Sequence, residues 1–139
     1  MIQDKELLLK DLSARLLYGI KFPMMCWDEE TGETVKPVTL YSINKDGYCH
    51  VSEDNYSPHI DEIKPYLFPL SSMTEEQERE LSKLGVSYGE YALHDDIRGL
   101  GIMVDEAYIF FEFCYKHHID FLGLIEKDLA IDATGLNIY

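Results

Sequence analysis

The segment at residues 107–115 constrains the fold more than any other part of this chain, because eight of its nine residues are apolar. The acidic residue before it, Asp105, is placed to cap a helix that runs through about Lys116. A helix that is apolar nearly all round is either central to a core or covered by a partner. We therefore expect this helix to be buried, either within the chain or in an assembly.

A second helix is predicted near the start of the chain, over residues 5–18. Asp4 is its expected N-cap, and Gly19 is suited to end it in a left-handed conformation. The prediction rests on leucines that recur at three- and four-residue spacing and so form one apolar stripe: Leu8, Leu9, Leu12, Leu16 and Leu17.

Residues 19–70 have the composition of short antiparallel strands. Val, Thr and Tyr are frequent in residues 34–43, and the segment 44–47 (Asn-Lys-Asp-Gly) is typical of a hairpin turn from which residues 48–51 return. Residues 60–70 carry two prolines and predict an edge strand or an extended crossing segment. Together these segments predict a small antiparallel sheet or a partial barrel, of the size of a Src-homology-3 domain.

The rest of the chain is predicted to be helical. Thr74 and Gln77 form a capping-box pattern that starts a helix ending at Gly85, and a last short helix is expected near residues 121–130. The overall prediction is a single α+β domain over residues 1–139, with its β-rich part at about 19–70 and its helical part at about 74–130.

The charge limits the classes of partner that we expect, and the cysteine content indicates the compartment. The formal net charge is −14, which argues against binding nucleic acid or an anionic membrane through a basic surface. The apolar region at residues 97–125 is interrupted by charged residues, so we expect no membrane span. Three cysteines are too few and odd in number for a disulfide framework, which favours a cytoplasmic protein. No cofactor is predicted.

Three blocks of the sequence resemble segments of a known protein family. Residues 63–76, residues 117–130 and residues 15–21 together resemble a family of small uncharacterised proteins of gut anaerobic bacteria and their prophages or mobile elements. The family usually has an arginine where this chain has Phe68, and often another where it has Leu122. The resemblance implies bacterial or phage origin and a cytoplasmic location, and it assigns no activity and no catalytic residue.

Histidine and aspartate suggest one candidate metal site. His94 and Asp95, together with His117 and His118, offer ligand types that suit zinc or a ferrous ion. Such a site would make the protein a small metal-dependent hydrolase. The simpler interpretation is that the paired histidines end the preceding helix and interact with its last carbonyl groups.

The leading functional prediction is a non-enzymatic protein-interaction module, an accessory of a mobile element or prophage. A homodimer through the helix at residues 105–115 is the simplest way to bury an apolar surface of this kind. An alternative is an acidic nucleic-acid mimic that inhibits a basic host protein, which requires one contiguous acidic face. The predicted contact residues for the module are aromatic: Tyr66, Phe68, Tyr108, Phe111 and Tyr115.

Overall fold

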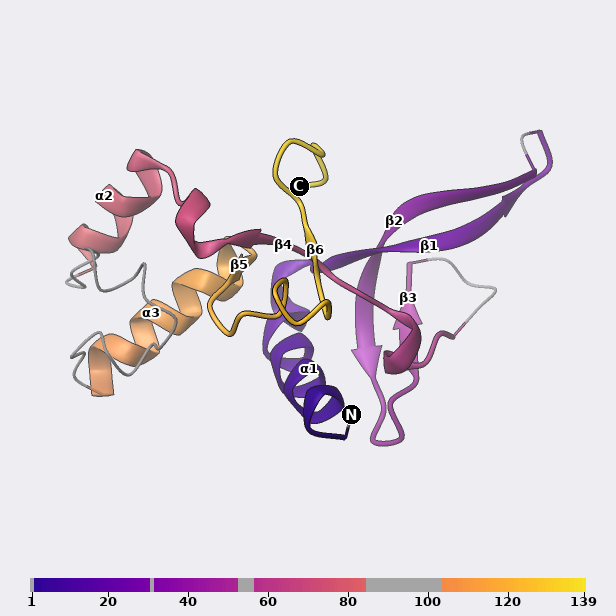
Figure 1. The fold of residues 1–139 in the computed structure, drawn as a ribbon, viewed down its shortest axis with the longest axis horizontal. Helices are drawn as coiled ribbons and strands as arrows, with labels where there is room; N and C mark the ends of the chain where they lie inside the picture. Colours follow the sequence, from indigo (N-terminus) through magenta and orange to yellow (C-terminus); the bar gives the residue numbers. More distant parts are fainter. Residues whose placement is uncertain (1, 31, 53–56, 85–103) are drawn as a thin grey trace.

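The structure is a computed structural model, in which residues 2–30, 32–52, 57–84 and 104–139 are described. It combines helices with two small sheets (Figure 1), which confirms the α+β prediction. The elements in chain order are α1 (Ile2–Arg15), η1 (Leu16–Tyr18), β1 (Lys21–Asp28), β2 (Gly32–Ile43), β3 (Cys49–Val51), η2 (Ile60–Glu62), β4 (Tyr66–Pro69), η3 (Leu70–Ser72), α2 (Glu75–Lys83), α3 (Val104–Lys116), β5 (Ile119–Asp120) and β6 (Ile131–Asp132).

The first sheet is antiparallel, with strand order β1-β2-β3. The turn between β2 and β3 forms where the Asn-Lys-Asp-Gly segment predicts it. Gly47 has φ +90°, and a Cβ atom there would lie 2.8 Å from Nε2 of His59, so glycine is required on both counts. The far ends of β1 and β2 extend away from the body of the molecule as a two-stranded arm (Figure 1).

The second sheet is parallel and has the order β5-β4-β6. Residues 60–70 were predicted to be an edge strand or an extended crossing segment, and the first of these alternatives is wrong, because β4 is the central strand of this sheet. Its two prolines explain how this is possible: Pro65 precedes the strand and Pro69 is its last residue, so neither removes an N–H group from the middle of the ladder. The N–H of Phe68 donates to the carbonyl of His118 at 2.8 Å, on the β5 side.

The predicted helices are confirmed in part. The capping box of Thr74 and Gln77 is present at the start of α2. The helix α1 starts at Ile2, so Asp4 lies in its first turn instead of capping it, whereas Gly19 has the expected left-handed conformation with φ 70°. Residues 121–130 form turns and no helix.

Asp120 explains the loss of that helix. Its carboxylate accepts hydrogen bonds from the N–H groups of Leu122, Leu124 and Ile125, at 3.2, 3.0 and 2.9 Å. Three bonds to one side chain wrap the backbone around the carboxylate, and a positive φ of 75° at Gly123 is incompatible with a continuing α-helix.

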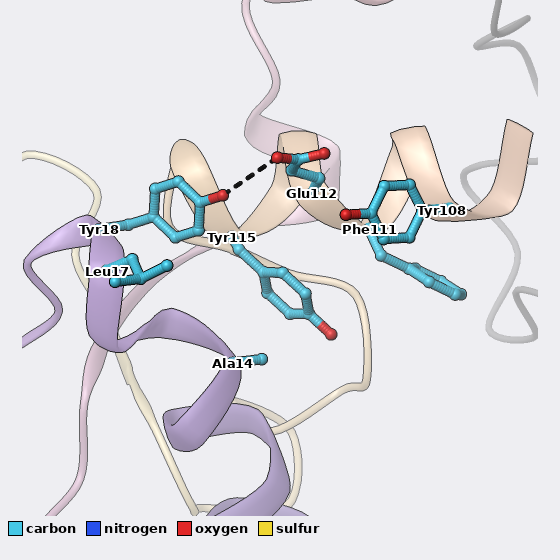
Figure 2. Close-up of a pocket in the computed structure, with 7 residues that line it drawn as sticks. All are labelled: Ala14, Leu17, Tyr18, Tyr108, Phe111, Glu112 and Tyr115. Carbon is cyan, nitrogen blue, oxygen red and sulfur yellow. Dashed lines mark hydrogen bonds between the residues drawn. The ribbon is translucent and has the colours of Figure 1, made fainter. Parts of the chain in front are cut away.

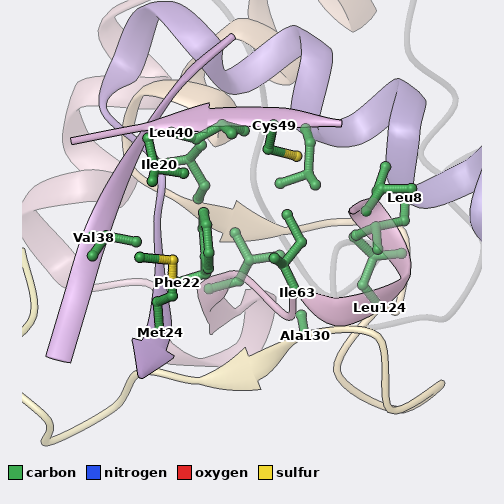
Figure 3. Packing of buried hydrophobic residues seen from close by; sticks show 14 of the residues in the cluster. Leu8, Ile20, Phe22, Met24, Val38, Leu40, Cys49, Ile63, Leu124 and Ala130 are labelled. Atoms are coloured by element: carbon green, nitrogen blue, oxygen red, sulfur yellow. The ribbon is translucent and has the colours of Figure 1, made fainter. Parts of the chain in front are cut away.

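Two apolar clusters form the core. The larger one joins α1, the antiparallel sheet and the turns at residues 122–130 (Figure 3). The smaller one contains Phe110, Phe113 and Cys114 of α3 together with Leu81 of α2 and Ile119 of β5. One side of α3 is therefore core, while Tyr108, Glu112 and Lys116 face solvent.

The strand order bears on the predicted β-architecture. Among the described residues the first sheet is antiparallel and three-stranded, with β1 and β3 at its edges, which fits the predicted small antiparallel sheet. No helix in the described part of the chain is long and apolar enough to cross a membrane.

Candidate functional site

A groove lies where the end of α1 and the η1 turn face α3 (Figure 2). Its volume is about 320 Å³, at the lower end of the range in which proteins hold small molecules or partner side chains. Apolar and aromatic side chains dominate its lining, which consists of Ala14, Leu17, Tyr18, Tyr108, Phe111, Glu112 and Tyr115. We call this feature the α1–α3 groove.

The local backbone explains the wall formed by Leu17. The apolar stripe of the sequence predicts that Leu17 faces the core, but its side chain is 90% exposed. The chain tightens from α-helix to 3-10 helix at Leu16, and a 3-10 turn contains three residues instead of 3.6. This change of period moves Leu17 off the buried face and onto the rim of the groove.

The opposite wall comes from α3. Tyr108 is 69% exposed, and Phe111 and Tyr115 are partly buried along the same side of the helix. The small side chain of Ala14 leaves room between the helices, and Tyr115 points towards it (Figure 2). Ala14 and the three aromatic residues of α3 thus line one common hollow.

One polar contact bridges the groove. The hydroxyl of Tyr18 donates to Oε1 of Glu112 at 3.3 Å. Partial removal from water and the negative charge of Glu112 raise the pKa of the Tyr18 hydroxyl, so this group remains a hydrogen-bond donor at neutral pH. An apolar groove with a single carboxylate suits the binding of an apolar side chain.

A buried arginine fixes the two walls relative to each other. Nε of Arg15 lies 2.8 Å from Oδ2 of Asp11, and both side chains are fully buried. The guanidinium also donates to the backbone carbonyls of Cys114 at 3.3 Å and Ile119 at 2.6 Å. Its central carbon lies 5.2 Å from the centroid of the Tyr115 ring, within the range of a cation–π contact.

The structure divides the five predicted contact residues. Tyr108, Phe111 and Tyr115 lie together in the α1–α3 groove. Phe68 is partly buried, with its ring 6.0 Å from that of Tyr139. Tyr66 is buried in the central strand β4, so the prediction that it forms part of an exposed surface is wrong.

The candidate metal site is not assembled by the residues that are described. Nε2 of His117 lies 3.0 Å from Oε2 of Glu80, whereas the His118 ring stacks on Tyr139 with centroids 3.7 Å apart. No group of three or more His, Cys, Asp or Glu side chains in the described ranges is arranged to hold a metal ion. The other two predicted ligands, His94 and Asp95, lie outside these ranges.

The cysteines are core residues. Cys26, Cys49 and Cys114 are free and buried. Burial raises the pKa of Cys49 to about 11 and that of Cys114 to about 12, so both remain thiols at neutral pH. A reactive cysteine requires the opposite, an accessible sulfur with a lowered pKa.

The chain was compared with family models, curated proteins and solved structures. None of them matches it.

Proposed function

We propose that the protein is a non-enzymatic protein-interaction module that forms a homodimer through the α1–α3 groove. The observation that carries this proposal is the pairing of Leu17, 90% exposed, with an apolar hollow directly beside it. A surface that contains both a projecting side chain and a hollow can pair with itself about a two-fold axis, since each copy supplies what the other accepts. Leu17 of one copy would enter the groove of the other.

The free energy of transferring apolar side chains from water favours burial of this surface. Moving one leucine side chain from water into an apolar site stabilises a complex by roughly 1.5–3 kcal/mol, and a two-fold contact does so twice. Tyr108, 69% exposed beside the groove, would add an aromatic contact. Each copy carries a net charge of −14, so the copies repel each other and added salt should strengthen the dimer.

Two further parts of the proposal concern the cellular location and the genetic context of the protein. We place the protein in the cytoplasm, where three buried free cysteines remain reduced. The resemblance in residues 15–21, 63–76 and 117–130 supports a role as an accessory of a prophage or mobile element.

Substitution of Leu17 tests the proposal. In sedimentation velocity experiments we expect wild-type protein to be dimeric and Leu17→Asp to be monomeric, because the substitution places a charge in the apolar contact. The matched control is Leu136→Asp, which introduces the same charge at a leucine that is 50% exposed and lies outside the groove, and which should remain dimeric. A dimer that survives Leu17→Asp, or a wild-type chain that is monomeric at every concentration, would contradict the proposal.

A further inference from the structure

The β1–β2 arm has an outer face with exposed apolar side chains. Trp27 is 74% exposed, and Met25 and Val35 are exposed beside it. The register pairs Met25 with Val35 and Trp27 with Glu33, and directly paired residues share one face of a sheet. On the other face Met24 and Cys26 are buried in the core, so the arm presents an apolar outer face on a fixed support.

Strand β1 also lies at the edge of its sheet, with a free side in the part of the chain that the structure describes. The N–H of Leu40 donates to the carbonyl of Ile20 at 3.0 Å, and bonded and non-bonded pairs alternate along an antiparallel ladder. Pro23, Met25 and Trp27 therefore belong to the non-bonded pairs, and their backbone groups point away from β2. The proline pair Pro23–Pro37 fits this assignment, because neither position needs an N–H for the ladder.

Lys21 provides an independent check on this direction. It belongs to the same alternating set, and its N–H donates outwards to the hydroxyl of Tyr139 at 2.9 Å. Further along the strand, the N–H groups of Met25 and Trp27 make no such bond to another segment within the described residues. Within the described residues β1 is thus an edge strand with N–H groups that no other segment engages, next to exposed apolar side chains, and this arrangement accepts an added strand.

Charge identifies the kind of strand that fits. Glu33 lies directly across from Trp27, and three more acidic residues follow Trp27 in the chain: Asp28, Glu29 and Glu30. A second copy would bring the same four carboxylates to this edge and be repelled. A positively charged strand would be attracted, and an exposed indole ring is the best aromatic partner for a guanidinium group.

We propose that the free edge of β1 binds an extended, arginine-rich segment of a basic partner protein. The added strand hydrogen-bonds to the backbone of Met25 and Trp27, and its arginine side chains stack on Trp27 and pair with the surrounding carboxylates. This site is separate from the α1–α3 groove and does not depend on self-association.

Trp27 makes the test direct, because it is the only tryptophan in the chain and its fluorescence reports on this site alone. The probe is a short peptide of alternating arginine and valine, titrated into the 139-residue chain. We expect a saturable change in Trp27 emission and weaker binding at higher salt.

Glu33→Gln combined with Glu30→Gln should weaken binding about tenfold, which corresponds to the loss of charge-assisted contacts. The matched control, Glu75→Gln with Glu76→Gln on α2, changes the net charge equally and should bind like wild type.

Two comparison peptides separate strand addition from charge attraction. A peptide with glutamate in place of arginine should not bind, and an arginine peptide methylated on every backbone nitrogen should bind much more weakly, because it cannot donate to the edge. Equal binding of the methylated peptide, or no emission change with the parent peptide, would overturn the proposal. The Leu17→Asp variant should bind the peptide normally, so failure of the groove proposal and failure of this one are distinguishable.

Discussion

At the scale of single residues, the ring of His118 lies flat against that of Tyr139, with an interplanar angle of 10°. Its backbone has φ 58°, and its buried Nδ1 atom has no hydrogen-bond partner among the described residues. Burial, together with the nearby positive charge of Arg15, lowers the pKa of His118 to about 4. The imidazole is thus neutral at physiological pH and serves as an aromatic packing group.

This burial predicts a dependence of stability on pH. Between the unfolded pKa of 6.5 and the folded value of about 4, the unfolded chain binds a proton at His118 that the folded chain does not. Stability therefore falls as pH drops through this window, by up to about 3 kcal/mol. Urea unfolding at several pH values should show this fall in wild-type protein and a shallower one in His118→Asn, in which asparagine tolerates the positive φ. Parallel curves for the two proteins would contradict the assigned pKa.

At the scale of elements, one side chain ties α1 to the C-terminal half. Arg15 connects Asp11 of its own helix to carbonyls at the end of α3 and in β5. The hydrogen-bonding capacity of the pair is incompletely satisfied, since the buried Oδ1 of Asp11 has no partner in the described part of the chain. Burial raises the pKa of Asp11 even though Arg15 acts against that shift.

Removing one partner of the Asp11–Arg15 pair should destabilise the fold more than replacing both partners with apolar residues. Arg15→Met leaves an uncompensated buried carboxylate, and we expect a loss of about 3–5 kcal/mol in the free energy of unfolding. Asp11→Leu combined with Arg15→Met removes both charges and should recover part of that loss. Chemical denaturation of the three proteins measures both values. A double variant less stable than Arg15→Met would show that the pair contributes net stability beyond mutual neutralisation.

The structural features that could be predicted are those that depend only on residues close together in the sequence. The capping box at Thr74, the turn at Gly47 and the helix end at Gly19 depend on residues a few positions apart, and all three were confirmed. The position of β4 depends on β5 and β6, which lie more than 45 residues further along the chain, as the pairs Phe68–Ile119 and Tyr66–Ile131 show. Sequence periodicity carries no information about such distant parallel pairing.

The groove was predictable on one side only. Its aromatic wall follows from the apolar composition of α3, which the sequence shows. The other wall depends on the change from α-helix to 3-10 helix at Leu16, and the leucine spacing instead predicts that Leu17 is buried. An exposed leucine at the end of a helix is visible only once the backbone of that turn is known.

At the scale of the whole molecule, the net charge of −14 should act in opposite directions at the two surfaces. Self-association through the apolar α1–α3 groove works against like-charge repulsion, so salt favours it. Binding of an arginine-rich strand to β1 depends on attraction between opposite charges, so salt weakens it. The sign of the salt effect therefore distinguishes contacts made by the two surfaces.

The most direct test of the proposed module is the molar mass of the wild-type chain, measured by light scattering coupled to size-exclusion chromatography at low and at high salt. Self-association through the groove predicts a mass of twice 16.1 kDa that persists or becomes more populated at high salt. A mass of 16.1 kDa at both salt concentrations would contradict the homodimer and leave the exposed Leu17 without a partner.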